Sequence, residues 1–252
     1  PLGEDTSIMR TTTLPSMLDI LTRNYNYRNK SARLYELARV YLPGGEDGLA
    51  NESKVLTLGA YGSDMDFYAM KGVIEAVLKD LRATDISFRT GTGEPTENSY
   101  HPGRYATVWS GDTCVGCFGE IHPLTAQNYG VDGAFYCAEL SLDALAQVKG
   151  PDPEYVPLPK FPAVTRDIAV VCDNAVTVGA LEECIRKGAK GLLKDVSLFD
   201  IYTGAGIPAG KKSVAFNLVL RADDRSLTAE EADADVKSIL DALKSDLGAV
   251  LR

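Results

Sequence analysis

The side chains best suited to chemistry form two groups along this sequence. The first group consists of thiols and imidazoles: Cys114-x-x-Cys117 in the stretch TCVGC, and two histidines, His101 and His122, each of which precedes a proline. A CxxC pair can bind zinc or carry out thiol redox chemistry, and a histidine pair can bind a metal or transfer protons. The sequence places no third ligand or nucleophile beside either pair.

We therefore expect structural roles for this first group. The TCVGC stretch is typical of a β-strand, on which residues three apart point to opposite faces, so we expect buried thiols rather than a metal or redox centre. The five scattered cysteines also argue against a disulfide framework. We expect residues 101–104 to form a turn, with Arg104 donating to an ion pair. No catalytic and no metal-binding residue is predicted.

The second group surrounds the stretch GKKSVAFNLVLR at residues 210–221. One face of this strand is apolar, and it carries Val214, Phe216, Leu218 and Leu220. The opposite face is small or polar, and it carries Ser213, Ala215, Asn217, Val219 and Arg221. A strand that is covered on both faces would be apolar throughout, so this alternation predicts a sheet with one open face.

The composition is that of an ordinary globular protein. The chain has 252 residues, of which 45% are hydrophobic and 24% are charged, and no apolar run is long enough to span a membrane. Together with the absence of a leader-like segment, this predicts a cytoplasmic protein. Because the first residue is a proline rather than a methionine, we expect a fragment of a longer polypeptide.

The charge is distributed unevenly along the chain. The net charge is −9, which argues against a broad basic surface for nucleic acids. Residues 158–252 carry 13 basic and 14 acidic side chains, whereas the rest of the chain carries 13 and 21. Any contact with a polyanion is therefore expected in the second region.

A proline-rich segment divides the chain. Residues 151–162 contain five prolines in twelve positions, which favours a stiff extended linker. We predict a module at 1–150, a linker at 151–160 and a domain at 161–252. In the first module, amphipathic helices at 14–27 and 66–81 and strands at 31–43, 54–62 and 105–121 predict an α+β fold with an antiparallel sheet.

The second domain is predicted to have the order βαββαβ. Strands are expected at 166–172, 195–202, 211–220 and 249–252, and Phe199 is expected in the core. One helix begins after Thr177 and runs to about Lys187, with Gly188 just beyond it as the C-terminal stop, and another begins with a capping box formed by Thr228 and Glu231. This ferredoxin-like topology places both helices on one face of the sheet, which explains the open face.

Several motifs in order resemble one family. FPAVTRDIAVV (161–171), LFDIYTG (198–204) and GKKSVAFNLVLRADDRSLTAEE (210–231) resemble the ferredoxin-fold anticodon-binding domain of the bacterial phenylalanyl-tRNA synthetase β subunit. PLGEDTSIMRTTTLPSML (1–18), LYELARVY (34–41) and HPGRYATVWSGDTCVGCFGEIHP (101–123) resemble the class II synthetase-like module that precedes that domain. The resemblance covers nearly the whole chain and implies a C-terminal fragment of the subunit.

The resemblance implies a place in a larger enzyme. It implies an (αβ)₂ ligase that charges tRNA-Phe with phenylalanine, with ATP and Mg²⁺ handled by the α subunit and no cofactor in this fragment. A working class II site needs arginines that grip the ATP phosphates. The glycine-bearing stretches GGEDGLA (44–50) and GTGEPTE (91–97) contain none, so we expect the first module to be an inactive partner that packs on α.

The resemblance also suggests which residues bind RNA. Tyr202 can stack on an unpaired base, or it can pack under the loop that follows it. Lys211, Lys212 and Arg221 can bind phosphate, and Asn217 can bind a base edge, although surface lysines are often only solvated. Arg166 is the sixth candidate, with an ion pair as its alternative role.

Two other functions remain open at this point. The chain could instead be a non-catalytic protein-interaction or effector-binding module with a ferredoxin-like domain. Salt separates the two possibilities, because an RNA site loses affinity as salt rises, whereas an apolar docking face does not. A thiol enzyme that uses Cys114 and Cys117 would require a depressed thiol pKa.

Overall fold

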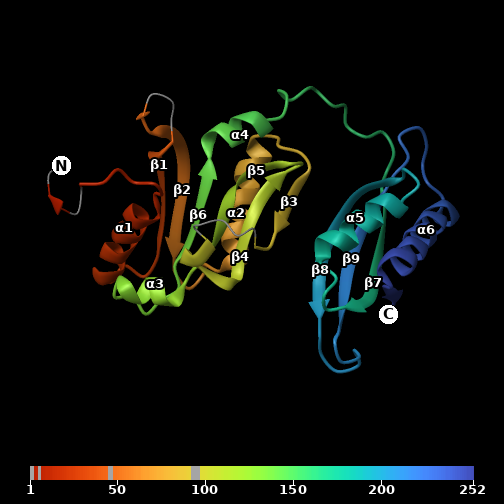
Figure 1. Cartoon of the computed structure of the whole chain (residues 1–252). Coiled ribbons are helices and arrows are strands. Elements are labelled where there is room, and N and C mark those ends of the chain that lie inside the picture. The colour runs from red at the N-terminus through yellow and green to blue at the C-terminus, as the bar shows by residue number, and fades with distance from the viewer. Residues whose placement is uncertain (1–2, 5–6, 45–47, 92–96) are drawn as a thin grey trace. The chain divides into compact units, whose positions relative to one another are not determined.

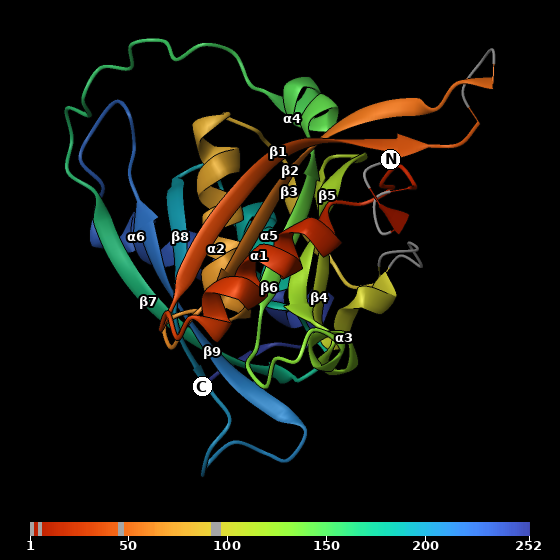
Figure 2. The same ribbon diagram turned by 90° about the vertical axis from the view of Figure 1, so that its left-hand side faces the viewer.

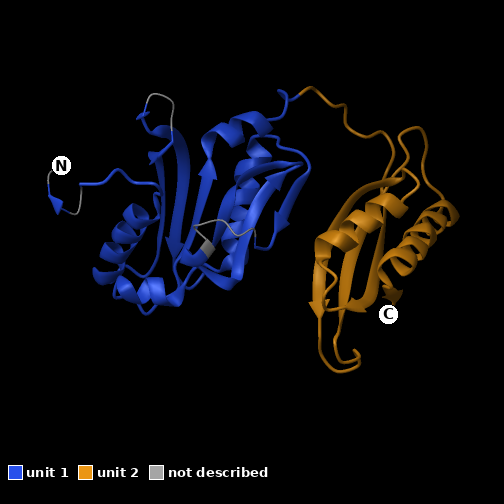
Figure 3. Ribbon diagram, in the orientation of Figure 1, with its two compact units in different colours: residues 1–153 blue, residues 154–252 orange. Residues whose placement is uncertain are grey.

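The computed structural model describes residues 3–4, 7–44, 48–91 and 97–252, and it divides into two compact units (Figure 1). Unit 1 comprises residues 1–153 and unit 2 comprises residues 154–252 (Figure 3). The parts of the GGEDGLA and GTGEPTE stretches at 45–47 and 92–96 lie outside the described residues. No described helix is both long enough and apolar enough to cross a membrane.

Unit 1 is built on one six-stranded antiparallel sheet. The strand order is β1-β2-β6-β5-β4-β3. The strands are β1 (Ala32–Leu42), β2 (Asn51–Tyr61), β3 (Ile86–Arg89), β4 (Tyr100–Ser110), β5 (Thr113–Ile121) and β6 (Tyr136–Ser141). The helices are α1 (Leu14–Asn26), α2 (Phe67–Asp80), α3 (Pro123–Asn128) and α4 (Leu142–Val148), with a 3₁₀ turn at Glu97–Ser99. The expected α+β module with an antiparallel sheet is confirmed.

Helices cover both faces of this sheet. Figure 2 shows α1 in front of the sheet and α2 behind it. The amphipathic α2 buries Met70, Ile74 and Leu78 against Phe118 and Leu140. On the other face, α1 packs against Cys117 and Cys137 of the strands. The buried residues of α1 form one stripe, which consists of Leu14, Met17, Leu18 and Leu21. A helix therefore covers each face of this sheet.

Unit 2 has the predicted order βαββαβ. Its elements are β7 (Val164–Asp173), α5 (Val178–Gly188), β8 (Leu193–Tyr202), β9 (Lys211–Leu220), α6 (Ala229–Leu247) and β10 (Val250–Leu251). The strand order β10-β7-β9-β8 is that of a ferredoxin-like sheet. The two long central strands carry the core, and β8 and β10 form the edges.

Both helices of unit 2 cover the same face of its sheet. The core joins Leu181 and Ile185 of α5 and Ile239 of α6 to Val170 and Phe216 of the strands. The predicted caps are confirmed, because Thr177 Oγ1 accepts from the Ala180 N–H and the Thr228–Glu231 capping box is formed. The predicted open face is therefore real: on the alternate residues of β7 and β9, no described helix packs.

Gly188 plays a different role from the one expected. It is the last residue of α5 rather than a stop beyond the helix. A Cβ atom at this position would lie 2.9 Å from the Ala242 Cβ atom and 3.1 Å from the Ile239 Cα atom. Its missing side chain therefore lets α5 approach α6 closely.

Candidate nucleic-acid interface

On the α1 side of unit 1, one row of mostly polar residues crosses the whole sheet. The strand register aligns Glu36, Thr57, Glu139, Cys117, Thr107 and Arg89, in the order β1-β2-β6-β5-β4-β3. Thr57 and Thr107 are buried. This row brings two carboxylates, two hydroxyls and a guanidinium onto one face of the sheet, so its contacts decide whether unit 1 offers a polar site there.

The carboxylate in this row is used to hold α1. The Glu139 Oε1 atom accepts from the Thr12 hydroxyl at 2.6 Å, from the Thr13 backbone N–H at 2.8 Å and from the Thr13 hydroxyl at 2.7 Å. The Thr13 hydroxyl also contacts the Thr57 hydroxyl. Because Thr13 is the N-cap of α1, this network ties the start of the helix to the middle of the sheet. Three donors already occupy the oxygen that would otherwise be available to a substrate.

The histidines and Arg104 have structural roles. His101 Nδ1 accepts from the Gly103 N–H within β4, so the expectation of a turn at residues 101–104 is wrong, whereas His122 is the N-cap of α3 and its Nδ1 accepts from the Leu124 N–H. Arg104 donates to the buried Glu120 at 2.7 Å, which confirms the predicted ion pair. Burial, followed by a hydrogen bond to Glu120, raises the pKa of Tyr136 to about 12.

Cys114 and Cys117 lie on the same face of the sheet, so the prediction that they point to opposite faces was wrong. Cys117 pairs with Thr107 and Cys114 pairs with Trp109, and the register shift between Val108 and Trp109 leaves Val115 without a partner. Because this β-bulge adds one residue, both cysteines point to the same face of the sheet. Cys114 is exposed, so the expectation of a buried thiol is wrong for this residue, whereas Cys117 is buried as expected. Burial raises the pKa of the thiols of Cys137, Cys172 and Cys184, so these three are poor nucleophiles.

The open face of unit 2 is the remaining candidate site. The register places on it Asp167, Ala169, Val171 and Asp173 of β7, Lys211, Ser213, Ala215, Asn217 and Val219 of β9, and Asp195, Ser197, Asp200 and Tyr202 of β8. Four carboxylates and one lysine lie among them. The face therefore carries more acidic than basic side chains, and its distinguishing groups are an aromatic ring, an amide and small side chains.

Tyr202 is held in place on this face. Its side chain is aligned with Ser213, its hydroxyl donates to the Ala205 carbonyl oxygen at 3.3 Å, and 38% of the residue is exposed. A Cβ atom at position 204 would lie 2.2 Å from the Tyr202 hydroxyl oxygen, so a larger residue there would displace the tyrosine ring. The tyrosine thus packs under the loop that follows it, as one of its two alternatives predicted, while part of the residue stays exposed.

Arg252 crosses the open face to reach Tyr202. Its backbone N–H donates to the Ala169 carbonyl oxygen on β7, and its guanidinium carbon lies 5.4 Å from the centre of the Tyr202 ring on β8. The small residues of β9 between them, Ser213 and Ala215, are buried. Sequence reasoning missed this residue, because no local pattern indicates a contact between opposite edges of the sheet.

The two lysines lie on different faces. Lys211 is on the open face, where its ammonium group lies 3.2 Å from an Asp173 carboxylate oxygen. Lys212 pairs with the buried Cys172 on the helix side, and it donates to the Asn174 carbonyl oxygen at 3.2 Å. Of the two lysines, only Lys211 therefore lies on the same face of the sheet as Tyr202 and Asn217.

Asn217 and Arg221 also differ in their hydrogen bonds. The Asn217 amide donates to Asp167 at 2.7 Å on the open face, so its carbonyl oxygen points away from that bond. Arg221 follows the end of β9, and its Nε atom is buried without a hydrogen-bond partner among the described residues. The face to which its guanidinium group turns does not follow from the alternation of the strand.

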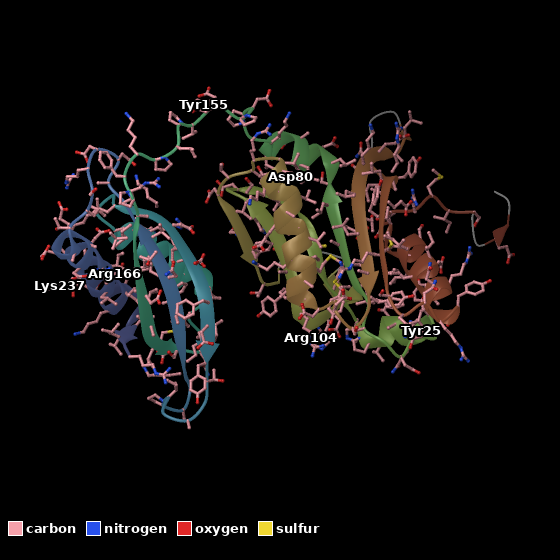
Figure 4. The ribbon with its side chains drawn as sticks, turned by 180° about the vertical axis from the view of Figure 1, so that it is seen from behind. Tyr25, Asp80, Arg104, Tyr155, Arg166 and Lys237 are labelled. Atoms are coloured by element: carbon pink, nitrogen blue, oxygen red, sulfur yellow. The ribbon has the colours of Figure 1, made fainter. Side chains whose placement is uncertain are left out.

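Arg166 lies on the helix side of the sheet. It pairs with Leu218 in the register and donates to Asp233 of α6 at 2.9 Å. Figure 4 shows Arg166 beside α6. The ion-pair alternative is therefore confirmed, with Asp233 as the partner.

Phe199 is exposed, and the prediction that it lies in the core was wrong. The residues on either side pair with β9, Leu198 with Phe216 and Asp200 with Ala215, so Phe199 is the extra residue of a second β-bulge. The bulge breaks the simple alternation, and 59% of Phe199 is exposed. Because β8 is an edge strand, no described strand covers its outer side.

Comparison with known proteins identifies both halves of the chain. The family model described as "Phenylalanyl tRNA synthetase beta chain CLM domain" matches residues 1–142, and the model described as "Ferredoxin-fold anticodon binding domain" matches residues 159–252. A pyrrolysyl tRNA synthetase from Desulfitobacterium hafniense superimposes with a TM-score of 0.45 and 15% sequence identity, covering 55% of this chain and 48% of that chain.

Curated relatives match from end to end of the chain. The phenylalanine–tRNA ligase beta subunit of Clostridium tetani is 42% identical over 253 residues, which cover 100% of this chain and 32% of that protein. The same subunit of Clostridium acetobutylicum is 39% identical, with 100% and 31% covered. The chain thus spans about a third of the length of the relatives it matches. With one family model matching more than half of its residues, the chain belongs to the phenylalanyl-tRNA synthetase beta chain family.

Proposed function

We propose that the open face of unit 2 binds the anticodon loop of tRNA-Phe. The observation that carries the proposal is that the part of the chain matching an anticodon-binding domain has a sheet with one face free of helices. Tyr202 offers a ring on which an unpaired base stacks, and Asn217 offers an amide for a base edge. Lys211 at the same surface neutralises one phosphate.

The charges of this face favour bases over phosphates. Asp167, Asp195 and Asp200 repel the RNA backbone, and Lys211 is already paired with Asp173. We therefore expect stacking to supply most of the affinity, and salt to weaken binding only modestly, since the release of counterions scales with the number of phosphates neutralised. Lys212, Arg166 and Arg221 remain candidates of lower priority, since their positions do not place them beside Tyr202.

We propose that unit 1 is an inactive module that packs on the α subunit of an (αβ)₂ phenylalanine–tRNA ligase in the cytoplasm. Its support is the Glu139 network, in which the central carboxylate of the sheet binds the start of α1 instead of a substrate. The division at residues 1–150, 151–160 and 161–252 is part of the same proposal. ATP and Mg²⁺ would act on the α subunit, with no step carried out by residues of this chain.

Charge and ring substitutions test the RNA site in the assembled ligase. Tyr202→Ala should weaken tRNA-Phe binding by about 5- to 150-fold, the effect of losing one stacked base. The double variant Lys211→Glu, Lys212→Glu should raise the KM for tRNA and leave the KM for phenylalanine unchanged. The matched control is Lys237→Glu, because Lys237 is exposed on α6 and lies on the helix side of unit 2. An unchanged KM for tRNA in the first two variants would refute the site.

A further inference from the structure

An exposed apolar patch lies along β8, next to the proposed RNA site. Leu198, Phe199, Ile201 and Tyr202 are 38%, 59%, 48% and 38% exposed. Isolated apolar residues on a surface need no explanation, but four within five positions of an uncovered edge strand are a liability for aggregation. Such a patch is expected to be retained for a binding role.

The bulge singles out Phe199 within this patch. Leu198 and Ile201 pair with the core residues Phe216 and Val214, so the register places both on the helix side of the sheet, where they are 38% and 48% exposed. Tyr202 pairs with Ser213 on the open face. Phe199 has no partner on β9 in the register, and as the extra residue of the bulge it lies on the edge strand with 59% of its surface exposed. Phe199 is the most exposed of these four residues.

Phe199 lies within reach of the RNA that Tyr202 would bind. The two residues are three positions apart on one strand, which corresponds to about 10 Å. Unstacked bases of a single-stranded loop are splayed apart and stack separately on aromatic side chains, so neighbouring nucleotides can occupy both rings. Asp195 and Asp200 on either side disfavour phosphate, but they do not disfavour the uncharged face of a base.

We propose that Phe199 is a second stacking platform for an unpaired base of the same RNA, at the edge of the sheet beside Tyr202. This inference rests on the proposed function, and it adds a binding residue that the core prediction had excluded. A base stacked there covers the exposed ring and the adjacent edge of β8. The occupant is a nucleobase rather than a protein segment, because the strand already carries Tyr202 and unit 2 matches an anticodon-binding domain.

The test uses the assembled ligase and the anticodon stem–loop of tRNA-Phe. Phe199→Ala should weaken binding by about 5- to 150-fold, and Phe199→Trp should bind as the parent does, since a ring is kept. Phe199→Leu keeps an apolar side chain without a ring, so it should lose nearly as much affinity as the alanine variant. Thermal unfolding of each variant should match the parent, because the side chain is mostly exposed.

Stem–loops that each lack one loop base identify the partner of Phe199. The loss caused by Phe199→Ala should disappear for one abasic RNA and persist for the others, which is the signature of a direct contact in a double-mutant cycle. Three results would overturn the proposal: full affinity in Phe199→Leu, an equal loss with every abasic RNA, or a loss of α-subunit assembly in place of RNA affinity. If Tyr202→Ala weakens binding and Phe199→Ala does not, the anticodon site stands and only this inference fails. If neither weakens binding, the proposed function fails as well.

Discussion

The two units cover their sheets in opposite ways. In unit 1, α1 and α2 lie on opposite faces, and the polar row through Thr57 and Glu139 is enclosed by the start of α1. In unit 2, α5 and α6 share one face, and the alternate residues of β7 and β9 are left without a helix. The same kind of antiparallel sheet therefore supplies internal attachment in one unit and leaves an open face in the other.

The polar side chains of the two sheets also differ in whether their hydrogen-bond partners are buried or exposed. Glu139 satisfies donors of its own chain, so removing it leaves buried groups unpaired. Asn217 bonds an exposed neighbour, and water can replace that partner at little cost. A polar residue on a covered face is thus coupled to folding, whereas one on an open face is available for a ligand.

The largest expected effect comes from Glu139→Ala. This change removes the acceptor of three hydrogen bonds at the start of α1 and should lower the free energy of unfolding of unit 1 by about 2 to 4 kcal/mol. Fluorescence of Trp109, the one tryptophan in the sequence, reports urea unfolding of this unit. Glu139→Gln, which keeps one carbonyl oxygen, should lose less. If Glu139→Ala unfolded at the same urea concentration as the parent, the polar row of unit 1 would not contribute to folding.

A smaller effect is expected for Asn217→Ala on the open face. The substitution removes one exposed hydrogen bond to Asp167, so the free energy of unfolding of unit 2 should change by about 0.5 kcal/mol or less. Hydrogen exchange of the β9 amides measures the stability of unit 2 separately from that of unit 1. The same variant should weaken binding of tRNA-Phe. A loss of stability comparable to that of Glu139→Ala would show that this face is structural.

The smallest effect concerns the acid stability of unit 2. A hydrogen bond from Arg225, followed by one from the Thr228 N–H, lowers the pKa of Glu231 from its ordinary value of 4.5. Since the folded-state pKa is the lower one, the stabilisation is complete above pH 4.5 and is lost as the pH falls through the folded-state value. Glu231→Gln should flatten this part of the pH profile of β9 hydrogen exchange. An unchanged profile would mean that the capping box contributes little in solution.

Local patterns predicted most of the regular structure. The stripe of α2, the alternation of β9 and the caps at Thr177 and Thr228 all rest on neighbours in the sequence, and all were confirmed. The short elements β3 and α4 were not predicted.

The bulges could not be predicted, and both errors about side-chain direction follow from them. A bulge depends on the register with a partner strand, so TCVGC and LFDIY contain no local signal for the unpaired Val115 and Phe199. Lys211 and Lys212 show the opposite case, because strict alternation alone places them on different faces. Contacts between residues distant in sequence, such as Glu139 with Thr13, follow only from the assembled sheet.

The contact between Arg252 and Tyr202 has a consequence for recognition. Together with the hydrogen bond to the Ala205 carbonyl oxygen, it holds the tyrosine in one rotamer before any ligand arrives. Side chains that become immobile only on association cost about 0.5 to 1.5 kcal/mol each, and this cost has already been met during folding. A preorganised ring of this kind would slow the release of a bound nucleotide more than it would speed its capture.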